Sequence, residues 1–441
     1  MLIQFSVKNF KTFKEKAVLS FIASNYDKET REDENIATIS DFNLRIVKSA
    51  VMYGANASGK SKFIDALMFM KRFVIGSSKE GQKGDPINVQ TYKLDTESEN
   101  EPAEFEVIFI YNNEMFRYGF EVNSQVVVSE WLYHKPKTKE VELFYREEQK
   151  FEFHERNFSK GSTLEKEDLI RENALLLSVA AQFNDKNAGK VLDWFKELKI
   201  ISGIQEEGYK NNAIAKIKDA AYNRKVLDLL KKADLGIENI TYKEYYFDFD
   251  PADNKKSFEE IFEGFKKNDE EAFSDITTVH KRYGIGRKRV DDVKFSMHFD
   301  ESSGTQKFFF LTGPVIDTLE TGGILVADEL DSKLHPNLVS KIVSIFNSKE
   351  LNPNNAQLIF NTHDTNLLNS RLFRRDQIWF IEKDRYGAAK LYSLADFKSE
   401  VRKADNFEDN YIRGKYGAVP LLNDFEDFIY SKMLQPNENE G

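Results

Sequence analysis

The sequence contains no cysteine and only six histidines, and these shortages exclude several kinds of chemistry. Without cysteine the chain cannot form disulfides, thiolate metal sites or a cysteine nucleophile. The histidines show no paired spacing of the kind that metal sites use. No apolar run approaches the roughly 20 residues that a membrane helix needs, and the opening "MLIQFSVKNF" lacks the pattern of a signal peptide. We therefore expect a cytoplasmic protein without a membrane segment.

Positive charge is also in short supply. The chain has 63 Lys and Arg against 73 Asp and Glu, a formal net charge of -10. Bulk electrostatics therefore argue against a generic nucleic-acid binder, and any contact with DNA or RNA must come from a local basic patch. What the chain does have is length and apolar content, with 441 residues of which 41% are hydrophobic. Those values favour two lobes, or one domain with a large insertion.

Hydrophobic periodicity predicts an α/β protein whose character changes along the chain. The apolar run that ends at Tyr53 is typical of a buried strand, and residues 60–74 carry apolar side chains at helical spacing. Residues 104–153 alternate with a period of two, which favours antiparallel hairpins. In the last third strands and helices alternate, which indicates a parallel sheet with covering helices.

The middle of the chain is predicted to be mainly helical. Residues 187–201 and 211–236 are amphipathic, and we expect the second stretch to be one helix that ends at Gly236. The fold class is thus α/β, with a mixed sheet, an antiparallel β-subdomain and an inserted helical lobe. The predicted parts are the N-terminal half of the α/β head at 1–158, the helical lobe at 159–298, the C-terminal half at 299–434 and a disordered tail at 435–441.

The stretch "GANASGKS" predicts a phosphate-binding loop. Gly54, Gly59, Lys60 and Ser61 fit the pattern GxxxxGK(S/T) without a mismatch, between a predicted strand and a predicted helix. Glycine lets backbone N–H groups curl around phosphates, and the helix that follows points its positive end at them. Lys60 would reach the β- and γ-phosphates, and Ser61 would ligate Mg²⁺. The loop residues expected beside the phosphates are also Asn56, Ala57, Ser58 and Lys62.

A second acidic element accompanies this loop. The apolar run "GILVA" ends in Asp328 and Glu329, and a buried strand that ends this way would place both carboxylates beside the phosphate loop. Asp328 would hold the Mg²⁺ shell, and Glu329 would activate the attacking water. The alternative is a strand that ends in two solvated carboxylates.

The motifs and their order resemble those of ABC/SMC-type ATPases. "GANASGKS", the signature-like "SSGTQ", "ILVADE" and a histidine at the end of a later strand follow one another as in those proteins, and "VKNFKTF" resembles their first strands. "DELDSKLHP", "FNTHD" and "NYIRGKYGAVPLL" are similar to the RloA/AbiL group of AAA-type proteins of abortive infection and phage defence. The resemblance implies a P-loop NTPase of ABC/SMC-head type that binds ATP and Mg²⁺ and hydrolyses ATP.

The resemblance also implies roles for single residues. Ser303 and Gly304 match the signature residues that touch the γ-phosphate held by a second subunit, so the implied assembly is a homodimer or higher oligomer around sandwiched ATP. Thr305 replaces the second signature glycine. The remaining matches are Asp331 in the loop that links the two sites, His363 as the switch histidine that senses the γ-phosphate, and Lys11 as a basic residue near the nucleotide.

Two residues and one segment each have a functional and a purely structural interpretation. Gln90 is either the glutamine that couples the lobes and reaches the metal or a solvated loop residue. His335, before Pro336, is either catalytic or the start of a helix. The segment 281–290, "KRYGIGRKRV", either binds a phosphate backbone or is a solvated loop, since two aspartates follow it. A second basic cluster, "RLFRRD", is a candidate protein interface.

Three functions compete. The first is a defence ATPase that controls a separate effector, which the resemblance implies to be an RloB-like or Toprim-type nuclease because this chain carries no recognisable nuclease motif. The second is an SMC-like DNA clamp for repair, without a dedicated effector. The third, the ATP-binding subunit of a transporter, is disfavoured by the antiparallel stretch after the loop and the long insertion.

Overall fold

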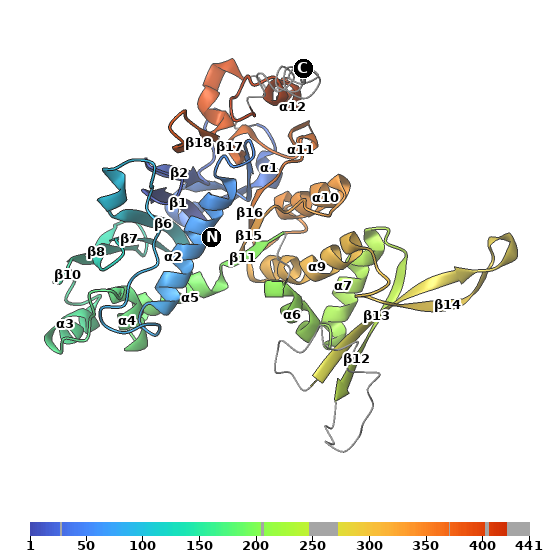
Figure 1. Cartoon of the computed structure of the whole chain (residues 1–441), viewed down its shortest axis with the longest axis horizontal. Helices are drawn as coiled ribbons and strands as arrows, with labels where there is room; N and C mark the ends of the chain where they lie inside the picture. The colour runs from blue at the N-terminus through green and yellow to red at the C-terminus, as the bar shows by residue number, and fades with distance from the viewer. Residues whose placement is uncertain (27–28, 204–206, 247–271, 370, 402–404, 421–441) are drawn as a thin grey trace, which may run out of the picture.

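Two large sheets and a separate lobe make up the molecule (Figure 1). The computed structural model describes residues 1–26, 29–203, 207–246, 272–369, 371–401 and 405–420. A six-stranded sheet takes strands from both halves of the chain, and only its last strand is antiparallel to its neighbour. Its order is β11 (Lys199–Ser202), β15 (Ile324–Asp328), β16 (Gln357–Asn361), β5 (Ser49–Tyr53), β17 (Ile378–Lys383) and β18 (Ala389–Ser393).

The second sheet is antiparallel and has seven strands. Side chains alternate between buried and partly exposed along β6, which is why the sequence alternates with a period of two. The sheet's order is β10 (Lys150–Phe153), β9 (Val141–Glu147), β8 (Val127–Lys135), β7 (Glu114–Val122), β6 (Ala103–Tyr111), β1 (Leu2–Lys8) and β2 (Ala17–Ser20). The smaller elements nearby are α1 (Glu32–Asn35), β3 (Ile36–Ile39) and β4 (Leu44–Val47).

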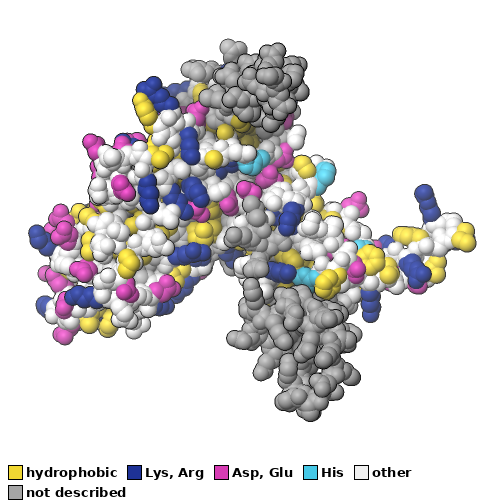
Figure 2. Space-filling model, viewed as in Figure 1, with side chains coloured by type: hydrophobic (Ala, Val, Ile, Leu, Met, Phe, Trp, Pro, Cys, Tyr) yellow, Lys and Arg dark blue, Asp and Glu magenta, His cyan; other side chains and the backbone are white. Residues whose placement is uncertain are grey.

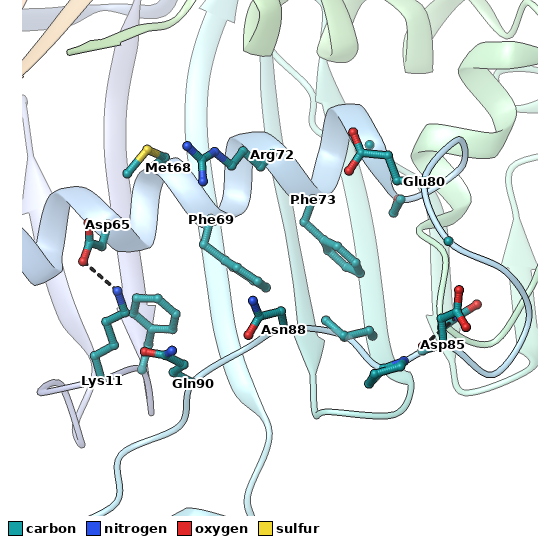
Figure 3. A pocket seen from close by; sticks show the side chains of 17 residues that line it. Lys11, Asp65, Met68, Phe69, Arg72, Phe73, Glu80, Asp85, Asn88 and Gln90 are labelled. Carbon is teal, nitrogen blue, oxygen red and sulfur yellow. Dashed lines mark hydrogen bonds and ion pairs between the residues drawn. The ribbon is translucent and has the colours of Figure 1, made fainter. Parts of the chain in front are cut away.

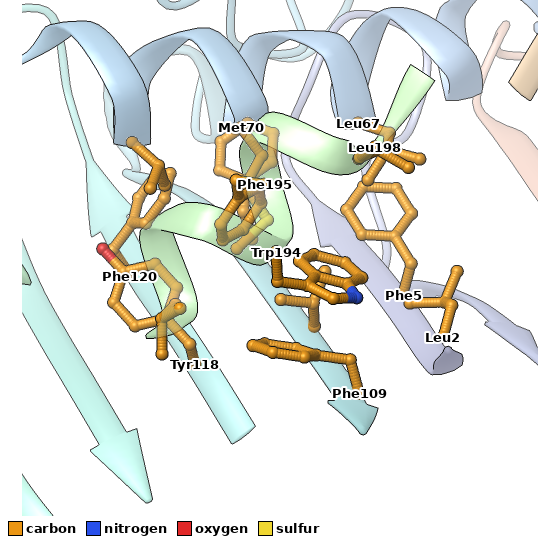
Figure 4. Close-up of a cluster of buried hydrophobic side chains, with 14 of the residues drawn as sticks. Leu2, Phe5, Leu67, Met70, Phe109, Tyr118, Phe120, Trp194, Phe195 and Leu198 are labelled. Atoms are coloured by element: carbon orange, nitrogen blue, oxygen red, sulfur yellow. The ribbon is translucent and has the colours of Figure 1, made fainter. Parts of the chain in front are cut away.

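Helix α2 (Lys60–Gly76) joins the two sheets. It contacts β15 of one sheet and β1 of the other, and it buries Leu67 and Met70 in a shared core. Helix α5 (Lys186–Glu197) closes this core, with the ring of Trp194 stacked 4.0 Å from that of Phe109 (Figure 4). Helices α3 (Ser159–Lys166) and α4 (Leu176–Gln182) pack in the same region. The phosphate-loop helix is therefore held rigidly from several sides.

The opposite face of the central sheet is covered by the helices of the second half. Helix α9 (Ser303–Thr321) buries most of its length there despite the internal Pro314. Helix α10 (Pro336–Asn347) buries one apolar side, as its helical periodicity predicts. Two shorter helices, α11 (Asn366–Asn369) and α12 (Phe407–Ile412), contact each other.

A lobe of two helices and three strands stands apart from the head (Figure 1). Helices α6 (Glu207–Lys216) and α7 (Ala220–Lys232) pack against α9. An antiparallel sheet follows, made of β12 (Ile237–Tyr246), β13 (Ala272–Tyr283) and β14 (Arg289–Ser296). The hairpin formed by β13 and β14 extends beyond the rest of the lobe (Figure 1).

The predicted α/β class, with its mixed central sheet and antiparallel β-subdomain, is confirmed. The inserted lobe differs from the prediction, because residues 159–198 pack into the core around α2 and the lobe holds as much strand as helix. The stretch 211–236 is not one helix. Asp219 caps the start of α7 by accepting a hydrogen bond from the Tyr222 N–H at 2.8 Å, which separates α6 from α7.

Two further expectations concern the stretch 187–201 and the tail 435–441. The amphipathic stretch 187–201 ends in a strand, since its last residues leave α5 and pair with β15 as β11. A parallel partner in the central sheet satisfies the backbone groups that the helix would have used. The expected tail at 435–441 lies outside the described residues.

Candidate nucleotide site

The candidate site lies where parallel strands of the central sheet end. Strands β5, β15 and β16 run in the same direction, so their carboxyl ends meet at one edge of the sheet. The phosphate loop follows β5, Asp328 ends β15, and the segment with His363 follows β16. Three motifs that lie between residues 54 and 363 of the sequence therefore come together, as their strand-end positions predict.

The glycines of the loop are required by close packing. A Cβ at Gly54 would lie 2.4 Å from the carbonyl oxygen of Ile381 on β17. Gly59 has a φ of 119°, which L side chains rarely adopt, and its Cβ would lie 2.9 Å from the Thr12 Oγ1. Asn56 and Ala57 are exposed at the outer curve of the loop. The loop is thus a fixed backbone turn whose outer surface is open to a ligand.

Lys60 lies at the centre of this loop. Its amine donates hydrogen bonds to the carbonyl oxygens of Gly54 at 2.8 Å and Ala55 at 3.1 Å, and only 6% of the residue is exposed. Burial lowers the pKa of Lys60, and the carboxylates of Glu329, Asp328 and Asp331 partly offset that effect. A buried cation that is held by two neutral carbonyls would gain by exchanging them for anionic oxygens.

Two residues that the sequence analysis did not assign hold the acidic pair in place. The Asn361 side chain donates to the Asp328 Oδ1 at 2.5 Å and accepts from the Glu329 N–H at 2.5 Å. Gly203, at the end of β11, donates its N–H to the Asp328 carbonyl at 2.5 Å, and a Cβ there would lie 1.9 Å from the Glu329 carbonyl. Asn361 belongs to the motif "FNTHD", but nothing in the sequence marked Gly203.

His363, predicted to be the switch histidine, lies next to this pair. The backbone N–H of His363 donates to the Asp331 Oδ2 at 3.3 Å, and the His363 side chain is exposed. Among the buried side-chain oxygens without a hydrogen-bond partner in the described part of the chain, Asp331 Oδ1, Ser58 Oγ and Thr12 Oγ1 belong to this region. Unpaired buried oxygens are costly, and together with the glycine loop they fit a polar ligand such as a nucleotide with its Mg²⁺.

The signature residues occupy the start of α9. Ser302 caps this helix by accepting the Thr305 N–H at 3.1 Å, which leaves Ser303 exposed on the first turn. A Cβ at Gly304 would lie 2.9 Å from the Lys333 carbonyl, so this glycine permits close packing of α9 on the loop after β15. The exposed Ser303 therefore faces solvent at a helix N-terminus, where anions bind well.

Lys11 and Gln90 lie on the outer side of α2. The Lys11 amine pairs with Asp65 at 2.6 Å, and Lys62, which is exposed, lies 3.3 Å from the same carboxylate. The Gln90 carbonyl accepts the Lys11 N–H at 2.8 Å. Both Lys11 and Gln90 line a cavity of about 560 Å³ along α2 (Figure 3). The structure brings Gln90 to Lys11, and among the described residues its side chain forms no hydrogen bond with Asp328 or Ser61.

Two other candidates have structural roles. His335 caps α10, since its Nδ1 accepts the Asn337 N–H at 3.1 Å. Of its two interpretations, this contact agrees with the start of a helix. In the basic cluster 371–375, Arg374 is fully buried and pairs with Asp376 at 2.9 Å. That arginine is therefore part of the core and is not available to the protein interface proposed for this cluster.

The fold and the site together define a P-loop protein of the α/β class. Residues 49–369 match the family described as "AAA domain, putative AbiEii toxin, Type IV TA system", and the chain belongs to this family. No curated protein matches the chain. Among solved structures, it is similar to the SMC head domain from Thermotoga maritima, with 15% identity, a TM-score of 0.39 and coverage of 89% of this chain and 98% of that one.

Two further properties concern the described residues alone. No helix among them has the length and apolar character that crossing a bilayer requires. They also contain no group of three or more His, Cys, Asp or Glu side chains arranged to hold a metal ion.

Proposed function

We propose that this protein binds ATP with Mg²⁺ and hydrolyses it. The observation that supports this most is the convergence, at one sheet edge, of a glycine loop around Lys60 with the carboxylates of Asp328 and Glu329. Lys60 would exchange two backbone carbonyls for phosphate oxygens, and Ser61 and Asp328 would hold the metal. Bound Mg²⁺ supplies charge neutralisation for the β- and γ-phosphates.

Glu329 is the proposed general base. Its backbone is held on one side by Asn361 and approached closely on the other by Gly203, so the direction of its side chain is restricted. Its φ of 55° is uncommon for a residue other than glycine, and such strained backbone is found at functional sites. A carboxylate fixed at this position would orient a water molecule and accept its proton. His363 is the proposed sensor of the γ-phosphate.

The proposed assembly is a head-to-tail pair around two ATP molecules. Ser303 is exposed at the start of α9 and makes no contact with its own phosphate loop. A second copy related by a two-fold axis would bring this helix N-terminus to the other copy's nucleotide, and the same contact would be repeated on the other side. Each nucleotide would then be bound by Lys60 of one copy and Ser303 of the other.

The proposed biological role is defence against phage, as an ATPase of the RloA/AbiL type that controls a separate effector nuclease, RloB-like or Toprim-type. The family is described as a putative toxin of a toxin–antitoxin system, and this description supports a role in phage defence. The absence of a metal-binding acidic cluster in the described residues supports an effector on another chain. The second candidate, an SMC-like DNA clamp without an effector, is favoured by the exposed basic segment 281–290.

ATP chemistry is tested with two substitutions. Lys60→Ala should abolish ATP binding in a fluorescent-nucleotide titration, because the cation at the centre of the loop is lost. Glu329→Gln should still bind ATP, but its hydrolysis rate should fall at least 100-fold, because the amide cannot accept a proton. Lys79→Ala, at an exposed position beyond α2, is the control and should behave as wild type. Unchanged ATP affinity in Lys60→Ala would disprove the loop assignment.

The two biological roles are separated by affinity purification of tagged Glu329→Gln from its native host. A nuclease recovered in stoichiometric amount would support control of an effector. DNA recovered without such a protein would support the clamp and would contradict the proposed defence role.

A further inference from the structure

The hairpin of β13 and β14 ends in a turn that has no role in the proposed ATP chemistry. Every residue from 281 to 292, a stretch that we call the arm, is exposed, and its root is joined to β12 by an ion pair between Lys281 and Glu238 at 2.6 Å. It extends from the lobe as a two-stranded ribbon (Figures 1 and 2). Its turn is well defined, since the Gly284 N–H donates to the Lys288 carbonyl at 2.8 Å and the Arg287 N–H to the Gly284 carbonyl at 3.1 Å.

The arm is strongly basic on a chain that is acidic overall. It carries five cations and two carboxylates, whereas the whole chain has a net charge of -10. The cations are Lys281, Arg282, Arg287, Lys288 and Arg289, and the carboxylates are Asp291 and Asp292. A local excess of positive charge on an exposed ribbon attracts a polyanion, and the acidic remainder of the surface repels it. The arm is therefore where a phosphate backbone would bind.

Lys281 pairs with Glu238 of β12 at 2.6 Å, whereas the other four cations of the arm are available to a ligand. Arg282 lies 3.6 Å from Asp291, and Arg289 lies 2.7 Å from Asp292, with all four side chains at least 44% exposed. Pairs so exposed contribute little free energy and are readily replaced by a phosphate. Arg287 and Lys288, at the turn, form no ion pair within the described residues. These two cations can contact phosphates without breaking an existing interaction.

The tip also presents apolar side chains without cover. Tyr283 is 58% exposed, Ile285 103% and Val290 68%. They are few and are interleaved with cations, so they form no contiguous apolar patch. Small apolar side chains among arginines suit contact with the edges of bases, such as the thymine methyl group.

The geometry points to double-stranded DNA as the partner of the arm. The major groove of B-form DNA admits a two-stranded β-ribbon, whereas the major groove of A-form RNA is too deep and narrow for side chains to read. In this arrangement Arg287 and Lys288 contact phosphates and Ile285 lies against base edges. This binding site is separate from the phosphate loop, because no hydrogen bond or ion pair joins an arm residue to residues 54–61 in the described chain.

The root of the arm connects it to the signature helix. His280 Nε2 lies 2.7 Å from Glu301 Oε1, and Glu301 directly precedes the cap residue Ser302 of α9. The Met297 N–H donates to the Ile276 carbonyl at 2.8 Å, which fixes the chain between β14 and α9. DNA bound by the arm would therefore affect the position of the start of α9. This is the part of the protein proposed to close over a second copy's nucleotide.

The test is a titration of a fluorescein-labelled 30-base-pair DNA duplex with the full chain, followed by anisotropy at several salt concentrations. Arg287→Ala combined with Lys288→Ala should weaken binding about tenfold. The slope of log K against log salt should become shallower by about two, since each phosphate contact contributes roughly 0.9. Lys137→Ala with Lys139→Ala, two exposed lysines in the turn between β8 and β9, is the matched control and should leave both values unchanged.

Several results would overturn the inference. The first is that the arm variant binds the DNA duplex as tightly as wild type does. The second is that the control variant loses as much DNA affinity as the arm variant, and the third is that an RNA duplex of the same sequence binds more tightly than the DNA. A protein that binds wild type and is lost from the arm variant, while DNA binding is unchanged, would also contradict it. The arm variant should keep wild-type ATP hydrolysis, so a failure of this inference is distinguishable from a failure of the proposed ATP chemistry.

Discussion

At the scale of single residues, the acidic pair depends on neighbours that contribute no chemistry of their own. Gly203 allows β11 to end directly against the backbone of Glu329, and Asn361 bridges Asp328 and Glu329 with one amide. Neither residue type is catalytic in itself. Both act by fixing where a carboxylate points, and a displacement of the base by even 1 Å can lower a rate strongly.

Gly203→Ala should therefore impair hydrolysis more than ATP binding. Its Cβ would have to displace the Glu329 carbonyl, which would move the base, and overpacking of this kind costs about 1–3 kcal/mol of stability. We expect hydrolysis at least tenfold slower with ATP affinity within about twofold of wild type, measured on folded protein below its melting temperature. Gly208→Ala, on α6 with open space around its Cβ, is the control and should be neutral or slightly stabilising. Normal hydrolysis in Gly203→Ala would contradict this role.

At the scale of elements, α5 stabilises the head by closing the core around α2. Trp194 is 3% exposed and stacks on Phe109 of β6 (Figure 4). Removal of a buried tryptophan from a close-packed site leaves a cavity, so Trp194→Ala should lower the free energy of unfolding by about 3–5 kcal/mol in a urea titration.

The control for this change is Phe183→Ala, which removes an aromatic ring that is 45% exposed beyond α4 and should cost far less. Equal losses for the two substitutions would show that α5 does not contribute to the core in this way. The result also bears on the division of the chain. Residues 159–298 were predicted to form one inserted lobe, whereas a large loss at Trp194 would place α5 energetically within the head.

At the scale of the whole molecule, the proposed pair requires the start of α9 to face a second copy. Ser303→Arg should leave ATP binding by the monomer intact and prevent the ATP-dependent dimer, because a long cation would block the close approach of the two copies. Light scattering after gel filtration, in the Glu329→Gln background with and without ATP, measures this directly. Ser159→Arg, at the exposed start of α3, should dimerise normally. An oligomer that does not respond to ATP in either background would disprove the sandwich.

The sequence determined the parts of this protein that depend on short stretches of chain. The P-loop, the acidic pair and the class of fold follow from local patterns, because a strand with an apolar run, a glycine turn and a helical stripe are each encoded over about ten residues. The break between α6 and α7 is local as well, and the capping residue Asp219 was its signal, overlooked within a longer amphipathic pattern.

The tertiary structure alone decided which distant residues meet. Gly203 reaches Glu329 only because β11 is the parallel neighbour of β15, and Arg374 is buried although its neighbours in the sequence look like an open basic surface. The segment 281–290 had two interpretations in the sequence, and its extension as a ribbon favours phosphate binding. Strand order, burial and close approach arise from contacts between segments far apart along the chain, and periodicity within one segment carries no information about them.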